Sequence, residues 1–330
     1  FVVTEGLARW QLATGDTLLE GVITRFGPAF GWLFLVYMAA WSFFVGSALM
    51  SACGVTLHAL LPVFEDAVTG KIVFGILCGL AGWALVLIGG YSLFEKLMKV
   101  CIGLMFVIVI VTVFALRPAW DAIALGLFVP SIPDVDGALG WTVALIGGVG
   151  GTVTVLCYGY WIREEGRSGS EEIANSRLDL AVAYAVTALF GIAMVIIGST
   201  VEVEGRGAGL LVGLAARLEE TLDPAAAIAF LAGAFGAVFS SLLGVWQAVP
   251  YLFADTWQQL RGGGHEVDTR ARPYRWYLAA LALLPMAGLF QGFAQIQKLY
   301  AVAGAWFFPA LTLALLILNT PGGTATDFLR

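Results

Sequence analysis

Residues 141–162 read WTVALIGGVGGTVTVLCYGYWI, an apolar stretch of membrane-spanning length that glycine and hydroxyl residues interrupt. Backbone polar groups in lipid must be satisfied internally, so non-helical chain at membrane depth survives only inside protein or beside a wet cavity. A hydrophobic span with a glycine-rich break therefore predicts the binding site of a transporter, and we place the function at residues 147–154. The residues that interrupt the span are Gly147, Gly148, Gly150, Gly151, Thr152 and Thr154.

The composition around this segment is that of an integral membrane protein: 60% hydrophobic and 12% charged residues, with a mean hydropathy of +0.89. The chain should be all-α, because it lacks the alternating segments of outer-membrane barrels. We expect a single transmembrane domain over residues 28–330, and its seventh helix is the weakest candidate because it is short and carries Pro285. The eight expected helices lie near 30–53, 72–91, 97–116, 139–162, 179–200, 225–254, 275–290 and 299–319.

Several classes of protein are excluded by what the sequence lacks. The four cysteines lie in or at the end of apolar helices without CxxC spacing, which indicates buried thiols rather than disulfides or a zinc site. Two histidines are too few for a histidine-rich metal site. No nucleophile–base pair, nucleotide loop or basic nucleic-acid patch is visible, so we expect neither an enzyme, a cofactor nor a nucleic-acid partner. The expected partner is the lipid bilayer, and nothing indicates an obligate protein partner.

Alternate loops differ in basic residues, which predicts the orientation in the membrane. Of the 17 lysines and arginines, 12 fall on one side and 5 on the other. The side with 12 should be cytoplasmic, and we call it the arginine-rich side; it carries Arg9, Arg25, Lys96, Lys99, Arg163, Arg167, Arg177, Arg261, Arg270, Arg272, Arg275 and Arg330. The chain starts with Phe1 and soon enters an amphipathic stretch up to Arg25, so we expect a piece of a longer polypeptide; a natural chain with these ends is the alternative.

The break offers neutral oxygen ligands at short spacing. Carbonyls freed at Gly150 and Gly151, with the hydroxyls of Thr152 and Thr154, would suit a hard cation. A divalent cation would also need a carboxylate from elsewhere, and without one a carbohydrate, an amino acid or a monovalent ion would fit equally well. The structural alternative is close helix packing through glycine, which membrane helices often use.

Further polar residues could line a pathway, each with a structural alternative. Cys157 could add a soft ligand or be a packed thiol. Ser240 and Ser241 could line the site or bond back to their own helix, and Gln297 lies at the mouth of the last helix. Asp255 could meet exiting cations, but a solvated helix end is the favoured interpretation. No ionisable residue occupies the middle of a span, which argues against a proton relay in this chain alone.

Four stretches together resemble the Nramp family of divalent metal transporters, and more closely a divergent bacterial branch of it. They are TEGLARWQLATGDTLLEG at 4–21, YSLFEKLMKVCIGLMFVIVIV at 91–111, GGVGGTVTVLCYGYWIREEG at 147–166 and AVFSSLLGVWQ at 237–247. The resemblance implies the LeuT-type fold, with two inverted five-helix repeats and broken first and sixth helices. Residues 1–27 would then be the end of the second family helix and a cytoplasmic loop, and the eight expected helices would be the third to tenth.

In this family an Asp and an Asn of the first helix, and a Met and a backbone carbonyl of the sixth, hold the metal ion. The resemblance places the Met at Thr154, the following Pro-His-Asn at 155–157, and the carbonyl at Gly151, so Gly151 and Thr154 would be metal ligands. The Gln of the tenth helix falls on Ala301, one turn after Gln297. An oxygen-only sixth helix favours Mg²⁺ or Mn²⁺ over Fe²⁺, since thioether selects softer metals.

The leading hypothesis is a secondary transporter of divalent metal cations that works by alternating access in a bacterial inner membrane. The metal ion would be the substrate, with or without a coupling proton. The alternatives are a LeuT-type transporter of an organic solute such as an amino acid, and an inactive truncated relative.

Overall fold

A computed structural model of the chain describes residues 1–330 except 89–90, 130, 133, 149–152, 200–212, 214, 217, 221–222, 264–266 and 320–330. The described part is almost entirely helical and contains no strand, as the composition predicts. The elements in chain order are α1 Val2–Thr14, α2 Leu18–Phe26, α3 Pro28–Leu60, α4 Ala67–Ile88, α5 Tyr91–Ala115, α6 Trp120–Phe128, α7 Ala138–Gly148, the 3-10 turn η1 Val153–Leu156, α8 Cys157–Glu164, α9 Glu172–Ser199, α11 Pro224–Leu260, α12 Arg272–Leu283, the 3-10 helix η2 Leu284–Phe290, α13 Phe293–Ala305 and α14 Phe307–Leu318.

Six segments of the described chain are long and apolar enough to cross a membrane, and a seventh is a pair of helices bent by 114° at a short break. The six are Pro28–Leu60, Ala67–Ile88, Ala138–Arg163, Glu172–Ser199, Pro224–Leu260 and Phe293–Leu318, and the bent pair is Ile102–Ala115 with Trp120–Phe128. The expected span at 275–290 is not among them. It consists of α12 and η2, because Pro285 cannot donate to the α-helical hydrogen-bond ladder and the chain tightens into a 3-10 helix there.

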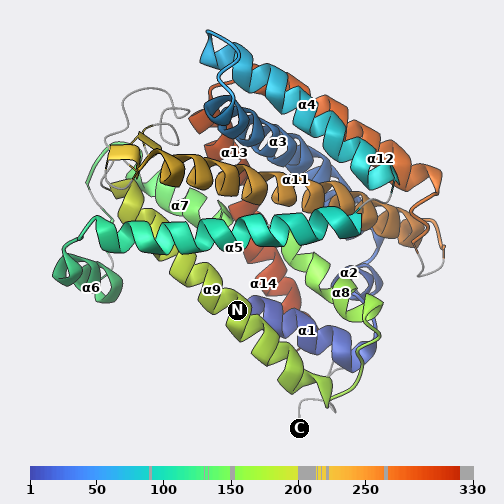
Figure 1. Ribbon diagram of the computed structural model, residues 1–330. Helices are drawn as coiled ribbons and strands as arrows, with labels where there is room; N and C mark the ends of the chain where they lie inside the picture. Colours follow the sequence, from blue (N-terminus) through green and yellow to red (C-terminus); the bar gives the residue numbers. More distant parts are fainter. Residues whose placement is uncertain are drawn as a thin grey trace.

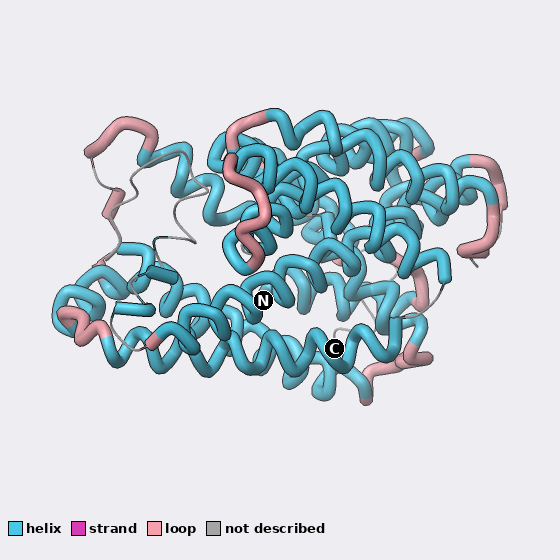
Figure 2. The backbone as a smooth tube through the Cα atoms, turned by 45° about the horizontal axis from the view of Figure 1, so that its top comes forward, coloured by secondary structure: helices cyan, strands magenta, loops and turns pink. Residues whose placement is uncertain are grey.

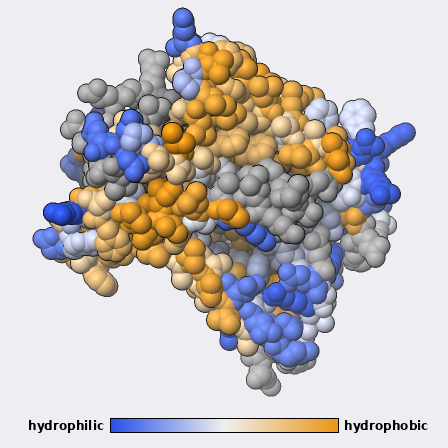
Figure 3. Space-filling model, in the orientation of Figure 1, coloured by the Kyte–Doolittle hydropathy of each residue, from blue (hydrophilic) through white to orange (hydrophobic). Residues whose placement is uncertain are grey.

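Apolar side chains cover much of the outer surface, which is the expected property of helices that face lipid. One face of α9 shows this directly, with large side chains between 36% and 67% exposed at every third or fourth residue: Leu178, Val182, Val186, Leu189, Ile192 and Val195. Figure 3 shows broad hydrophobic areas over the helices and a hydrophilic tip at the lower right. A soluble protein would not leave such a surface in water, so the chain is an integral, multi-pass membrane protein.

The helices form two groups that agree in both backbone views (Figures 1 and 2). In the first group α3 packs on α4, α11, α13 and η2, and α11 also packs on α5 and α12. In the second group α1 packs on α8, α9 and α14. The segment containing α7, η1 and α8 therefore runs from α13 in the first group to α1 in the second.

Small residues let the helices of the first group approach closely. A side chain at Gly54 of α3 would overlap the carbonyl oxygen of Lys71 and lie 2.9 Å from the amide nitrogen of Gly75, both on α4. Trp246 of α11 is fully buried and donates from its indole nitrogen to the carbonyl oxygen of Gly79 at 3.3 Å. Glycine residues thus let α3, α4 and α11 pack closely on one another.

Capping residues determine where α11 and α2 begin. Asp223 accepts a hydrogen bond from the amide of Ala226 at 2.8 Å, directly before Pro224, so α11 starts one residue before the expected position 225. At the start of α2, Thr17 and Glu20 form a reciprocal capping box. The capping role fixes the Glu20 carboxylate at the beginning of α2, where it faces α8.

Candidate functional site

The broken span begins with α7, which ends at Gly148, and resumes as the 3-10 turn η1 at Val153 before α8 starts at Cys157. A stretch of 3-10 helix within a long helix often marks a hinge. The structure therefore describes the chain on both sides of residues 149–152, which contain the predicted interruption. Three of the predicted ligands, Gly150, Gly151 and Thr152, fall within this stretch and lie outside the described residues.

Gly147 joins α7 to α13 at backbone distance. A Cβ atom at this position would overlap the carbonyl oxygen of Ala301 and lie 2.7 Å from the amide nitrogen of Ala305. At the neighbouring Gly148, the nearest atom to such a Cβ is the Ala301 side chain at 3.9 Å, an ordinary contact. Close packing through glycine therefore explains Gly147, and Ala301, to which the resemblance assigns the family's glutamine, is the small residue beneath it.

Thr154 and Cys157 follow the break. Thr154 lies in the 3-10 turn η1, and Cys157 is the first residue of α8. Thr154 is half-buried, whereas Cys157 is only 3% exposed and belongs to the main apolar core with Leu156 and Tyr160. Burial in this core fits the packed-thiol interpretation of Cys157.

The remaining predicted residues bond to other elements. The hydroxyls of Ser240 and Ser241 both donate to the carbonyl oxygen of Ala237 at 2.9 Å, which is the back-bonding alternative for these serines. Gln297 of α13 donates from its amide nitrogen to the carbonyl oxygen of Ala48 at 2.8 Å and so ties α13 to α3. These contacts give the three side chains structural roles, and the role of lining a pathway stays a prediction.

Sequence reasoning missed an ion pair that fastens the far end of α8. Arg163 binds the carboxylate of Glu20 and also donates to the backbone oxygen of Gly15 at 3.3 Å. Glu20 is 4% exposed and accepts a second hydrogen bond from the amide of Thr17 at 2.5 Å. Threonine followed three residues later by glutamate is a capping-box signature, so the sequence could have marked Glu20 as a fixed carboxylate.

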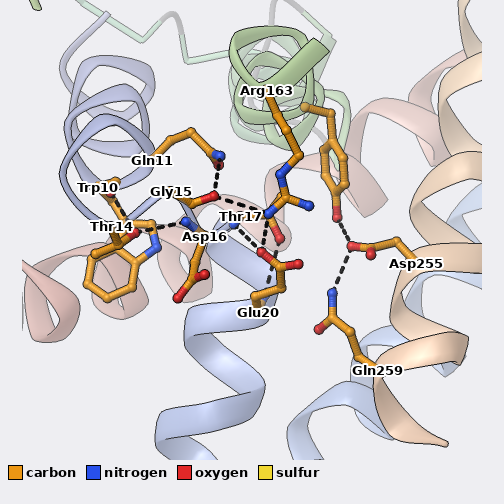
Figure 4. A network of polar contacts seen from close by, with 11 residues as sticks. Trp10, Gln11, Thr14, Gly15, Asp16, Thr17, Glu20, Arg163, Asp255 and Gln259 are labelled. Carbon is orange, nitrogen blue, oxygen red and sulfur yellow. Dashed lines mark hydrogen bonds and ion pairs between the residues drawn. The ribbon is translucent and has the colours of Figure 1, made fainter. Parts of the chain in front are cut away.

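Asp255 is the second buried acid, on α11 and opposite α8 (Figure 4). Its side chain is 0% exposed, so the interpretation as a solvated helix end is wrong. The Oδ2 atom accepts hydrogen bonds from the Tyr160 hydroxyl and, at 2.8 Å, from the amide nitrogen of Gln259. The Oδ1 atom is buried and has no hydrogen-bond partner.

The two acids face one guanidinium. Among the side chains that the structure describes, Glu20 and Asp255 are the buried acidic residues, and Figure 4 shows Arg163 between them with its bond to Glu20. We call Glu20, Arg163, Tyr160 and Asp255 the α8 anchor, because both acids bind a side chain of α8. Within the described residues, no group of three or more histidines, cysteines or acids could hold a metal ion.

A family model described as "Nramp: Natural resistance-associated macrophage protein-like" matches residues 1–321 of this chain. No curated protein matches it.

Proposed function

This chain belongs to the Nramp family of divalent metal transporters, which have the LeuT fold, and we propose that it carries Mg²⁺ or Mn²⁺ in preference to Fe²⁺ by alternating access around the break between α7 and α8. The observation that supports the proposal is that the two halves of the span are attached to different helices. A hinge between differently anchored halves is what alternating access requires.

The first half is held by α13 through Gly147. The second half is held by α1, α2 and α11: a Cβ atom at Gly159 of α8 would lie 3.0 Å from Leu7 of α1, and the α8 anchor reaches α2 and α11. Because the two halves share no partner helix in these contacts, α8 can move while α7 stays on α13.

The proposed ion preference rests on the kind of ligand at the break. Thr154 stands where the family resemblance expects a thioether, and a hydroxyl oxygen suits hard cations such as Mg²⁺ and Mn²⁺. We propose that Gly150, Gly151, Thr152 and Thr154 supply oxygen ligands, with Gly151 and Thr154 closest to the metal ion. The burial of Cys157 in the core favours a packing role for it. A carboxylate of the family's first helix would complete the site.

The setting in the membrane follows from the same family. We propose that the arginine-rich side faces the cytoplasm of a bacterium and that the chain lies in the inner membrane. Residues 1–27, which form α1 and α2, are proposed to be the end of the second family helix and the loop after it. The transported cation is the proposed small-molecule partner, and lipid is the surrounding one.

Uptake into proteoliposomes tests this function. With equal inward gradients of Mn²⁺, Mg²⁺ and Fe²⁺, we expect faster uptake of Mn²⁺ or Mg²⁺ than of Fe²⁺. Thr154→Ala should reduce uptake of all three about tenfold, the loss of roughly one good ligand contact. Thr154→Met should raise the ratio of Fe²⁺ to Mg²⁺ uptake, since a thioether prefers softer ions.

Thr187→Ala is the matched control, because Thr187 is an exposed threonine whose hydroxyl bonds only its own helix, at Ala183. If Thr154→Ala behaves like this control, the break does not hold the metal ion. Uptake of an amino acid in place of any metal would favour the organic-solute alternative, and no uptake of either would favour the inactive relative.

A further inference from the structure

Asp255 lies near the end of a helix that is longer than a membrane is thick. At about 1.5 Å per residue, the 37 residues of α11 extend about 55 Å, against roughly 30 Å for the hydrocarbon core of a bilayer. Asp255 is six residues before Arg261, the C-cap on the arginine-rich side. The acid is therefore close to water at that side, yet its side chain is 0% exposed.

One of the side chains that cover Asp255 comes from α8. Tyr160 of α8 is 6% exposed, packs edge-to-face on Tyr251 of α11, and donates its hydroxyl proton to Oδ2 of Asp255. Cys157 and Leu156 pack in the same core one turn earlier. The helix that contributes Tyr160 to the cover over Asp255 is thus the helix that follows the break.

The hydrogen bonds leave one oxygen of Asp255 without a partner. Both donors, Tyr160 and Gln259, bind Oδ2, and Oδ1 is buried without a partner in the part of the chain that the structure describes. A buried ionised carboxylate is stable only when it is paired with a cation and its lone pairs are satisfied. An unsatisfied buried oxygen costs less on a neutral carboxyl group than on an ionised one, so a proton bound to Oδ1 lowers the cost of burying Asp255.

The charges around Asp255 point in the same direction. The ionisable groups that act on it are Tyr160 and Arg163 of α8 and Glu20 of α2, while Gln259 of its own helix is neutral. The guanidinium of Arg163 is bound to Glu20 and to the backbone oxygen of Gly15. The one cation is thus already paired with one of the two buried acids, so it would compensate a second negative charge on Asp255 only in part.

We propose that Asp255 is a proton-binding site of this protein, occupied while α8 rests on α11 and vacated when α8 moves away. When α8 leaves, water reaches Asp255 from the arginine-rich side, the Oδ1–H bond breaks, and the proton passes to that water. Tyr160 keeps its own proton, and the carboxylate stays in contact with water until α8 returns. The proposed movement rests on the proposed function, but the occupancy of the site by a proton does not.

A proton fits this position better than a metal ion. Asp255 offers a single free oxygen, and no group of three or more histidines, cysteines or acids in the described residues could hold a metal there. Metal ions need several ligands, whereas a carboxyl group needs one oxygen for its proton. Protonation also links to conformation: a proton that binds only the covered arrangement stabilises α8 on α11, and alkaline conditions release it.

Infrared difference spectroscopy of the purified protein in lipid nanodiscs tests the site without any transport. The wild type should show the carbonyl band of a protonated carboxylic acid at neutral pH, and Asp255→Asn should remove it. Asp179→Asn is the matched control, since Asp179 is an acid on α9 whose side chain is 60% exposed and is paired with Arg167. A wild-type spectrum without the band, or a band that survives Asp255→Asn, would overturn the proposal.

The link to movement is tested by the pH dependence of metal uptake. Uptake by the wild type should rise as the pH on the arginine-rich side rises, because deprotonation favours release of α8. Asp255→Asn, which keeps the shape and stays neutral, should transport with a flat pH profile, and Tyr160→Phe should shift the profile. An unchanged profile in Asp255→Asn contradicts the coupling. If the wild type transports nothing, the infrared result still decides whether Asp255 holds a proton, and only the proposed function fails.

Discussion

The two halves of the broken span, α7 and α8, differ in the contacts that hold them to the rest of the protein. On α7, Gly147 brings backbone against backbone at Ala301 and Ala305 of α13, with no room for a single carbon atom. On α8, an ion pair and a hydrogen bond to two buried acids, Glu20 and Asp255, add to the apolar packing of the helix. Backbone contacts through glycine are permanent, whereas polar side-chain contacts can be exchanged for water. The difference supports our proposal that α8 is the half that moves and α7 the half that stays.

The largest expected effect comes from breaking the fixed half. Gly147→Ala places a Cβ atom into the carbonyl oxygen of Ala301, and neither backbone can yield without separating α7 from α13. We expect a loss of about 3 kcal/mol in the free energy of unfolding, the upper end for overpacking, and a lower melting temperature in detergent. Gly148→Ala is the control, because its Cβ would find open contact at 3.9 Å. Equal melting temperatures of the two variants would show that α7 is not held in this way.

The next effect concerns the ion pair of the moving half. Arg163→Ala leaves the Glu20 carboxylate buried without its cation, and we expect a loss of roughly 2 kcal/mol, since Arg163 itself is 27% exposed and partly screened. The double variant Arg163→Ala with Glu20→Gln should recover part of that loss because the unpaired charge is gone. Additive losses in this double-mutant cycle of melting experiments would mean that the pair does not hold α8.

A smaller effect is expected for the hydrogen bond of the α8 anchor. Tyr160→Phe removes a donor from the buried Asp255 and should cost about 1 kcal/mol. Tyr158→Phe on the same helix is matched to it, since the Tyr158 hydroxyl lies 3.5 Å from the carbonyl oxygen of Ser176 and makes at best a weak bond. Thermal unfolding of the two variants should separate them, and a larger loss for Tyr158→Phe would reverse our assignment of the anchor.

The smallest effect lies outside the spans, at Glu5 of α1. Burial raises the pKa of Glu5, but hydrogen bonds and charges from Arg177 and Arg9 outweigh it and lower the pKa below its usual value. A lowered pKa contributes stability above the pKa of the unfolded chain, and this stability disappears as the pH falls through the folded value. We expect Glu5→Gln to lose at most about 1 kcal/mol at neutral pH and nothing in acid. A loss that persists in acid would assign Glu5 a role other than these ion pairs.

The features that the sequence predicts correctly depend on local chemistry. The start of α11 near residue 225 and the all-helical membrane fold follow from capping residues and apolar length. The interruption within 147–154 includes residues 149–152, which lie outside the described residues, so it stays a prediction. The expected span at 275–290 is helical but changes from α-helix to 3-10 helix next to Pro285, a boundary that hydropathy alone does not set, and its crossing of the membrane stays a prediction. For Ser240 and Ser241 the sequence offered two interpretations, and the structure shows the back-bonds to Ala237.

The burial of Asp255 could not be predicted, because it depends on where α8 lies in space. Residues 160 and 255 are 95 positions apart, and nothing in either sequence segment indicates that they meet. The close approach at Gly147 is similar: the sequence shows a glycine, and only the fold shows that Ala301 lies against it. Contacts between residues far apart in the sequence therefore determine what anchors each half of the span.

Spin-label distance measurements in nanodiscs would show whether α8 moves relative to α11 while α7 stays on α13. In a background without the native cysteines, one label pair would join Trp161 of α8 to Arg261 at the end of α11, and the other would join Leu145 of α7 to Leu299 of α13; all four side chains are exposed. Adding Mg²⁺, or raising the pH, should change the distance distribution of the α8–α11 pair and leave that of the α7–α13 pair unchanged. Movement of the α7–α13 pair, or two unchanged distributions, would contradict the account.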